Sequence, residues 1–244
     1  MTWAEIGWVT IGLAAILLVV FSLLFNGRFR YRTRQLPAVK AFLDHRIRAI
    51  ERGEKRQVVL GEQFWSRAYP ALGLQALSVL PSLVSLDAAA DDRQSVTAGS
   101  GELVLFARQI IRGSYQDGFS SGLCVALPGP TPLSFLAGFL PELGYHPTGS
   151  LGLLGNYGQF GALLTERAVM RGAHTFAAAG SISAQAALFL NVRDLLIGEE
   201  VFMLPGLIDP TPSRLASLAT EDILRVLLMA LLVIAAILKM AGVL

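Results

Sequence analysis

The sequence predicts an α/β protein with a mostly parallel, Rossmann-like sheet that has helices on both faces, flanked by an N-terminal and a C-terminal transmembrane helix. Strand-like and helix-like segments alternate about five times in the middle of the chain, which is typical of a parallel sheet. The strand-like segments are continuously apolar, as expected of strands buried on both faces. Hydrophobic residues make up 53% of the chain and charged residues only 16%, and the apolar excess lies at the two termini.

The first predicted membrane span is the run of residues 6–25, which contains no charged side chain. At about 1.5 Å per residue, this helix would cross a hydrocarbon core of about 30 Å. Trp3 and Trp8 stand where an interfacial aromatic belt would lie. A cleavable signal peptide is the alternative, but no Lys or Arg precedes the run, so we expect a retained anchor over residues 1–26.

The second predicted span is residues 223–244, within an anchor that covers residues 221–244. Residues 226–238, between Arg225 and Lys239, are apolar on every face of a helix. An amphipathic helix lying on the membrane surface is the alternative, but it would need a polar stripe. We expect Thr220 to cap this helix, because two acidic residues follow it and would favour the first turn.

The orientation follows from the arginines that come directly after the first span: Arg28, Arg30, Arg32 and Arg34. By the positive-inside rule, both termini lie outside the cell membrane and the main domain is cytoplasmic. We expect these four side chains to face membrane lipids with anionic headgroups. The formal net charge is only +2, so no broad basic surface and no nucleic-acid partner are expected.

Between the spans, we expect a basic juxtamembrane helix over residues 27–56 and a cytoplasmic α/β domain over residues 57–220. The helical period of Val39, Phe42 and Ile47 predicts the juxtamembrane helix itself, and Gly53 ends it. Apolar runs and turn residues then predict, in order, a strand at 57–62, a helix at 70–86 with a kink or break at Pro81, a strand at 94–99, a helix at 101–112, a strand at 123–129, a helix at 132–143, a strand at 150–156, a helix at 160–171, a strand at 174–180 and a helix at 183–190. Residues 195–204 close the series, as a strand alone or as a strand that runs into a short helix.

Small or polar residues follow three of the predicted strands: Gly99 and Ser100, Gly129 and Thr131, and Gly180 and Ser181. In an open α/β sheet, ligands lie beyond the carboxyl ends of the strands, so these turns are candidates for a ligand or contact loop. Tight turns require such residues in any case, and the sequence leaves both interpretations open.

The segment 155–161 reads GNYGQFG, with Gly155, Gly158 and Gly161 ahead of a predicted helix. The spacing is neither the dinucleotide fingerprint nor a P-loop, since no Lys follows and bulky Tyr157 and Phe160 intervene. We therefore favour a close backbone approach or a turn that needs positive φ. An anion held by free amides at the helix start is the alternative.

No catalytic or metal constellation is visible. His45, His146 and His174 lack a second ligand at helical spacing, so each is expected to be structural and no metal or cofactor is expected. Cys124 stands in an apolar strand-like run, which favours a buried structural thiol. Three carboxylates are candidates for a functional role: Glu166, Glu199 and Glu200. If Glu199 and Glu200 were on a strand, they would point to opposite faces of the sheet.

The run from Gly158 to Phe202 contains the pattern G-Q-F-G…L-T-E…R-G-A…A-A-G…D-L-L-I-G-E-E-V-F. With L-P-A-V after the first span and S-L-A-T-E-D before the last, it resembles an uncharacterised prokaryotic membrane-protein family, a domain of unknown function typical of green filamentous bacteria. The similarity covers most of the chain and is weakest over about residues 63–90. It implies an α/β domain between two anchors, and it implies no activity, cofactor or catalytic residue.

The predicted function is that of a membrane-anchored structural or assembly subunit, whose cytoplasmic domain forms a homo-oligomer or docks in a larger membrane complex. Two tethers would lower the entropic cost of lateral association, and the Gly-, Ala- and Ser-rich segment 172–187 would permit close helix contact. The alternative is a membrane-tethered sensory domain that binds a small ligand or a nucleotide. An enzyme ranks third, because the sequence indicates no substrate.

Overall fold

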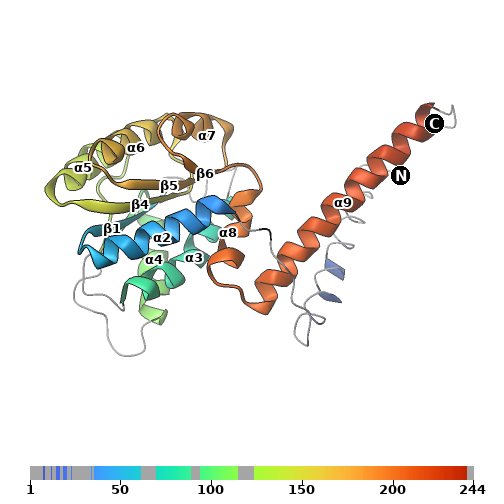
Figure 1. Ribbon diagram of the computed structural model, residues 1–244, viewed down its shortest axis with the longest axis horizontal. Helices are drawn as coiled ribbons and strands as arrows, with labels where there is room; N and C mark the ends of the chain where they lie inside the picture. The colour runs from blue at the N-terminus through green and yellow to red at the C-terminus, as the bar shows by residue number, and fades with distance from the viewer. Residues whose placement is uncertain are drawn as a thin grey trace. The chain divides into compact units, whose positions relative to one another are not determined.

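The computed structural model of the chain describes residues 34, 36–61, 70–88, 94–114 and 124–240, together with isolated positions among the first 23 (Figure 1). The chain divides into two compact units. One unit is Gln35–Asp209, and the other combines Met1–Arg34 with Pro210–Leu244. The first unit therefore includes the helix that the sequence assigned to a separate juxtamembrane segment.

The larger unit is built on a six-stranded sheet in which every neighbouring pair is parallel, which confirms the predicted α/β class. Its strands are β1 (Lys55–Leu60), β2 (Gln94–Ala98), β3 (Cys124–Ala126), β4 (Thr148–Leu154), β5 (His174–Ala178) and β6 (Asp194–Leu196). They lie in the order β3-β2-β1-β4-β5-β6, so the chain starts at the centre and winds outward in both directions. The strand order reverses between β1 and β4, and ligands bind beside such a point in many proteins of this architecture.

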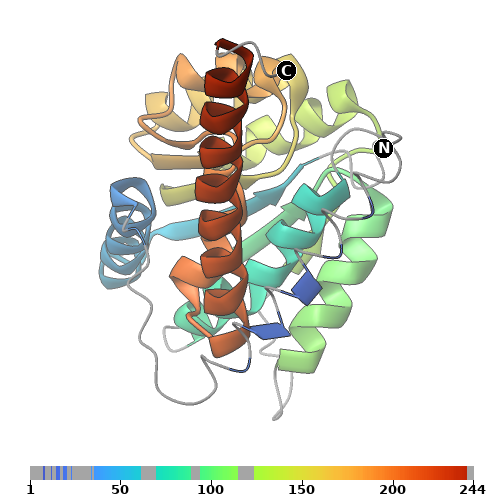
Figure 2. The ribbon, with the colours of Figure 1, turned by 90° about the vertical axis from the view of Figure 1, so that its right-hand side faces the viewer.

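Helices cover both faces of the sheet, as Figures 1 and 2 show. One face carries α5 (Pro132–Tyr145), α6 (Gly161–Met170) and α7 (Ile182–Phe189), with the short 3-10 turn η1 (Gly158–Phe160) ahead of α6. The other face carries α2 (Pro37–Glu51), α3 (Pro70–Ala88) and α4 (Gly101–Ser114), and α8 (Glu200–Ile208) packs against α3. The core under α5–α7 is formed by buried side chains such as Phe135, Phe139 and Leu153, and it includes Ala177 of β5.

Helix α2 is fixed to the sheet by an aromatic contact. Phe42 is fully buried, and its ring stacks on that of Phe176 in β5 with the centroids 4.5 Å apart. Gly152 in β4 makes room for this ring, because a Cβ at that position would lie 2.9 Å from Phe42 Cζ. The contact holds α2 across β4, β5 and β6.

Two predicted elements need correction, and one that was left open is settled. Helix α3 continues through Pro81, so of the predicted kink or break the break was wrong. Strand β3 is only three residues long, Cys124–Ala126, and its Cys124 side chain lies outside the described residues. Residues 195–204 follow the second alternative: β6 ends at Leu196, Gly198 adopts φ +63°, and α8 begins at Glu200.

The C-terminal helix α9 (Pro212–Met240) belongs to the other unit. It begins eight residues before the expected cap, so the prediction that Thr220 caps this helix was wrong. The Thr220 hydroxyl is instead inside the helix and donates to the Ala216 carbonyl at 2.8 Å. Among the described residues, no helix combines the length and the hydropathy that a membrane span needs. Most of the predicted first span, residues 6–25, lies outside the described residues, as do Arg28, Arg30 and Arg32.

Replacing Phe42 by Ala should reduce the free energy of unfolding by about 3–5 kcal/mol, because the cavity would open beneath α2 where Phe176 loses its partner. Ile47→Ala on the same helix is the control, since Ile47 is exposed and should cost less than about 1 kcal/mol. Denaturant unfolding followed by circular dichroism measures both. Equal losses in the two variants would contradict the role given to the stack.

Candidate functional site

The turns predicted as ligand or contact loops meet at one edge of the sheet. Gly99 and Ser100 follow β2, Gly129 and Thr131 follow β3, Gly155 follows β4, and Gly180 and Ser181 follow β5. Because all strands are parallel, these positions lie together at the carboxyl edge. The structure therefore places these residues together, as expected of the parallel sheet that the sequence predicts.

The hydroxyl groups at this edge are used to cap helices. Ser181 Oγ accepts from the Ala184 amide at 3.3 Å and donates to Asn156 Oδ1 at 2.6 Å. Thr131 and Ser134 form a reciprocal capping box at the start of α5. Ser100 Oγ accepts from the Leu103 amide of α4 at 3.4 Å. Each cap satisfies an amide that the first helical turn leaves without a partner, which gives these side chains a structural role.

At the point where the strand order reverses, the ends of β1 and β4 touch. A Cβ on Gly155 would lie 2.8 Å from the Gly61 amide nitrogen, and Gly155 itself has φ +123°. The cavity beside these glycines measures about 10 Å³, and its lining includes Leu60, Leu154 and Asn156. That volume holds about one water molecule.

The GNYGQFG segment owes its glycines to backbone conformation and packing. Gly158 has φ +54°, and a Cβ on Gly161 would lie 3.0 Å from the Leu188 side chain of α7. Tyr157 is buried, and its hydroxyl donates to the Val59 carbonyl of β1. The prediction of a close approach and of turns that need positive φ is confirmed at these positions.

The three candidate carboxylates do not form one site. Glu166 is exposed on α6, in an open groove that it shares with Leu140 and Met170. Glu199 and Glu200 are not on a strand, which corrects the expectation that they point to opposite faces of the sheet. They stand at the start of α8, where negative charge favours the helix dipole.

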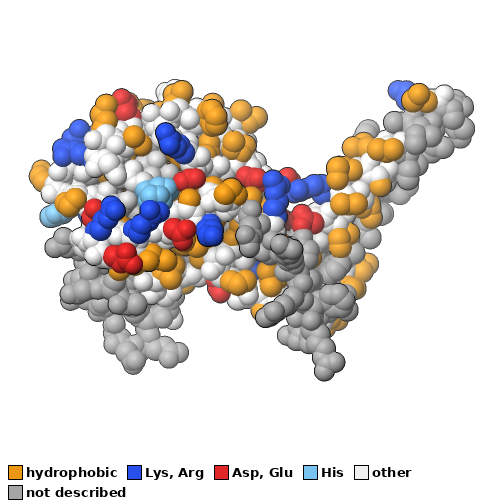
Figure 3. Space-filling view, in the orientation of Figure 1, with side chains coloured by type: hydrophobic (Ala, Val, Ile, Leu, Met, Phe, Trp, Pro, Cys, Tyr) orange, Lys and Arg blue, Asp and Glu red, His pale blue; other side chains and the backbone are white. Residues whose placement is uncertain are grey.

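The opposite, amino edge of the sheet carries a cluster that the sequence did not predict. The ring of His45 in α2 stacks on that of His174 at the start of β5, with the centroids 3.6 Å apart. His174 Nε2 lies 2.8 Å from Asp194 Oδ2, at the start of β6. Figure 3 shows imidazoles in pale blue with basic and acidic side chains beside them on the face that displays α2.

Burial favours the uncharged form of the two imidazoles in this cluster. It lowers the pKa of His174 to about 4, and the positive charges of His45 and Arg48 act in the same direction. Burial also lowers the pKa of His45 and raises the pKa of Asp194. At neutral pH, His174 is therefore neutral, and the 2.8 Å contact assigns its proton to Nε2, which donates to the Asp194 carboxylate.

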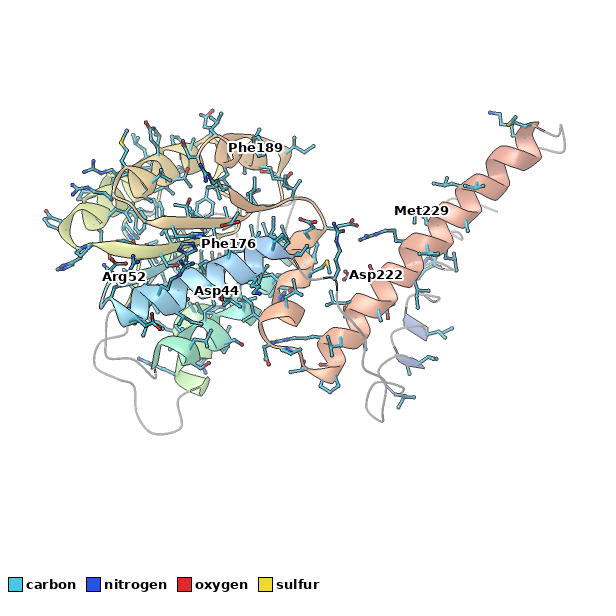
Figure 4. All side chains as sticks on the ribbon, in the orientation of Figure 1. Asp44, Arg52, Phe176, Phe189, Asp222 and Met229 are labelled. Atoms are coloured by element: carbon cyan, nitrogen blue, oxygen red, sulfur yellow. The ribbon has the colours of Figure 1, made fainter. Side chains whose placement is uncertain are left out.

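Beside the imidazoles lies a pocket of about 300 Å³, formed by the last turns of α2, the start of β4 and the turn between α6 and β5. Its charged side chains are Arg48, Arg52, Glu54 and Arg171. Figure 4 labels Arg52 at the end of α2. The available signal was the helical spacing of His45, Arg48 and Arg52, which places them along one side of α2.

No group of three metal-ligating side chains occurs in the part of the chain that the structure describes. Comparisons with known protein families, with curated proteins and with solved structures found no match. The resemblance drawn from the motifs therefore stays a prediction, and the assignment of function depends on the geometry of this chain.

Lowering the pH from about 7.5 to about 5.5 should reduce the free energy of unfolding by about 1 kcal/mol, because the unfolded chain protonates His174 near 6.5 and the folded chain only near 4. The contribution of His174 to the free energy of unfolding is thus fully present above pH 6.5 and is lost as the pH falls towards 4. The raised pKa of Asp194 has the opposite effect on the free energy of unfolding at lower pH. The comparison between the two pH values therefore stops at about 5.5. His174→Gln keeps a donor to Asp194 and does not titrate, so its stability should vary less over this range. Urea titrations measure the free energy of unfolding at each pH. If it fell equally with pH in the wild type and in His174→Gln, the lowered pKa of His174 would be contradicted.

Proposed function

We propose that this protein is a membrane-anchored assembly subunit whose α/β body docks on a second copy of itself through α7. The observation that carries the proposal is the outward face of α7 and of the residue that ends it: Ile182, Phe189 and Leu190 are 82%, 70% and 76% exposed. Figure 3 shows hydrophobic side chains gathered over this helix, and Figure 4 labels Phe189 on it.

Helix α7 is apolar on two sides. Ala184 and Leu188 are buried against the body, while Ile182, Ala186 and Phe189 recur at helical spacing on the exposed side. Residues 175–192 contain no charged side chain. The exposed apolar residues of α4 differ in this respect, since Glu102, Arg108 and Arg112 accompany them. A contiguous uncharged apolar patch is typical of an interaction surface.

A second copy of the chain fits this surface best. Two α7 helices related by a twofold axis would meet without bringing like charges together or burying an unpaired charge. Small side chains at Ser183 and Ala186 on the exposed side permit a close approach of the helices. Docking on a different subunit of a larger membrane complex is the other outcome that the test below can give.

The membrane anchors are part of the proposal and are argued from the sequence of the termini, since no described helix by itself meets the length and hydropathy of a span. Residues 6–25 and 226–238 are uncharged. In α9, the four consecutive residues Val226, Leu227, Leu228 and Met229 are all exposed. Successive residues of a helix are 100° apart, so these side chains surround it, as lipid-facing side chains would. The proposed topology places both termini outside and the α/β body in the cytoplasm.

Ligand binding at the carboxyl edge remains the alternative function. Its candidate residues are the caps and glycines already described, and the described part of that edge offers a cavity of about one water molecule. No observation there favours a ligand over the structural roles, so the assembly proposal is preferred.

The full chain in mild detergent should behave as a dimer, and Phe189→Glu should weaken dimerisation at least about 100-fold, because the twofold axis brings two carboxylates into one apolar contact. Leu105→Glu is the matched control, since Leu105 is 69% exposed on the opposite face of the sheet. Light scattering across a concentration series measures both. A monomeric wild-type chain with no co-purifying subunit, or equal effects of the two variants, would refute docking through α7.

Alkaline carbonate should leave the full chain in the membrane pellet, and protease added to intact cells should spare the α/β body, because two spans would hold it on the cytoplasmic side. Truncation before residue 210 removes α9 and leaves one predicted anchor, so that variant should also stay in the pellet. Release of the wild-type chain by carbonate would overturn the anchoring proposal.

A further inference from the structure

The pocket at the amino edge is lined by three positively charged side chains, each of them exposed to solvent. Three guanidinium groups, those of Arg48, Arg52 and Arg171, line it together with one carboxylate, Glu54. Among the described residues, none of the three arginines has a carboxylate within salt-bridge distance, and Arg48 donates only to the backbone carbonyl of Asp44 at 3.3 Å. Lys55, on the neighbouring strand, has such a partner in Glu142 at 2.6 Å. Lys55 is thus paired, whereas Arg48, Arg52 and Arg171 line the cavity without a carboxylate partner among the described residues.

Stabilisation of helix C-termini explains only part of this arrangement. Arg52 and Arg171 directly follow α2 and α6, where positive charge is favourable. One cation at the end of each helix would stabilise that helix. Helix stabilisation does not require the cations of two helices to line the same cavity. Their convergence raises mutual repulsion, which a bound anion would relieve.

We propose that this pocket binds a small phosphomonoester. Guanidinium groups match the oxygens of a phosphate with paired hydrogen bonds, and three of them suit a dianion. A volume of about 300 Å³ lies at the lower limit of small-molecule pockets, which suits a phosphate with a short organic group and excludes a dinucleotide.

Glu54 defines the rest of the ligand. Its carboxylate lies over Gly149, where a Cβ would displace it, and within the pocket it can accept a hydrogen bond from a hydroxyl group. Glycerol 3-phosphate has both features as a free solute, and phosphatidic acid presents the same phosphomonoester, without the free hydroxyl groups, as a lipid headgroup. The surrounding groups are uncharged or already paired: His174 is neutral and bound to Asp194, and Lys55 is bound to Glu142. The pocket arginines are therefore the groups left to bind the phosphate.

The first experiment titrates the full chain, in nanodiscs of phosphatidylcholine, with glycerol 3-phosphate and with inorganic phosphate, against chloride at equal ionic strength. Both phosphates should raise the melting temperature saturably, as a ligand of the folded state does. Arg52→Gln and Arg171→Gln should each weaken binding about 10-fold or more, the loss expected for a hydrogen bond to a charged group. Glu54→Gln should strengthen the binding of inorganic phosphate several-fold, because it removes a like charge.

Arg112→Gln is the matched control, because Arg112 lies in the last turn of α4 as Arg48 lies in the last turn of α2, outside the pocket. It should bind both phosphates like the wild type. A response to phosphate no larger than that to chloride, or an equal loss in Arg112→Gln and Arg52→Gln, would overturn the proposal.

A second arm identifies the source of the phosphomonoester. The titration with glycerol 3-phosphate is repeated in nanodiscs that contain phosphatidic acid. If phosphatidic acid occupies the pocket, it should weaken the response of the wild-type chain to glycerol 3-phosphate. The Arg171→Gln variant should then respond equally in nanodiscs with and without phosphatidic acid. These two results together assign the pocket to a lipid headgroup. An unchanged response assigns it to a free solute. The dimer interface on α7 is not involved, so these results test the pocket separately from the proposed assembly function.

Discussion

The packing of Phe42 against Phe176 determines most of what is distinctive in this chain. This contact, over the space that Gly152 leaves, fixes both the position and the rotation of α2 on the sheet. Once Phe42 fixes the helix, the 3.6-residue period determines where the side chains of the following turns lie, and these turns run to the amino edge of the sheet. His45 then stacks on His174, and Arg48 and Arg52 line the pocket. A single apolar contact thus places a set of polar groups that have no strong attraction for one another.

The sequence predicted the fold well because the signals for its elements are local. The apolar runs of β1, β4 and β5 and the small residues after them are read within a few positions of each other, and they gave a parallel sheet with the turns at one edge. The errors arose where two local signals competed. Thr220 followed by Glu221 and Asp222 resembles a helix start, but Pro212 provides an earlier one and α9 continues through both. Its hydroxyl bonds to a carbonyl four residues back, as threonine does inside helices.

The amino-edge cluster could not be predicted in the same way. His45 and His174 meet only because α2 crosses β5, and Asp194 joins them because β6 pairs with β5. Each residue taken alone is unremarkable, and no spacing in the sequence relates them. Burial then decides their chemistry, since it lowers the pKa of both imidazoles and keeps the stack from becoming a pair of repelling cations.

The two edges of the sheet differ in how they provide positive charge. At the carboxyl edge, helix amides point outward and would attract an anion, but side-chain oxygens of Ser100, Thr131 and Ser181 already accept from them. At the amino edge, α2 and α6 present their C-terminal carbonyls, which repel an anion. Any affinity for phosphate there has to come from side chains and must first overcome the field of two helix ends. A single arginine would do little more than cancel that field. The positive charge of three arginines around one cavity is larger than the negative field of the two helix ends. Helix stabilisation does not explain this additional positive charge.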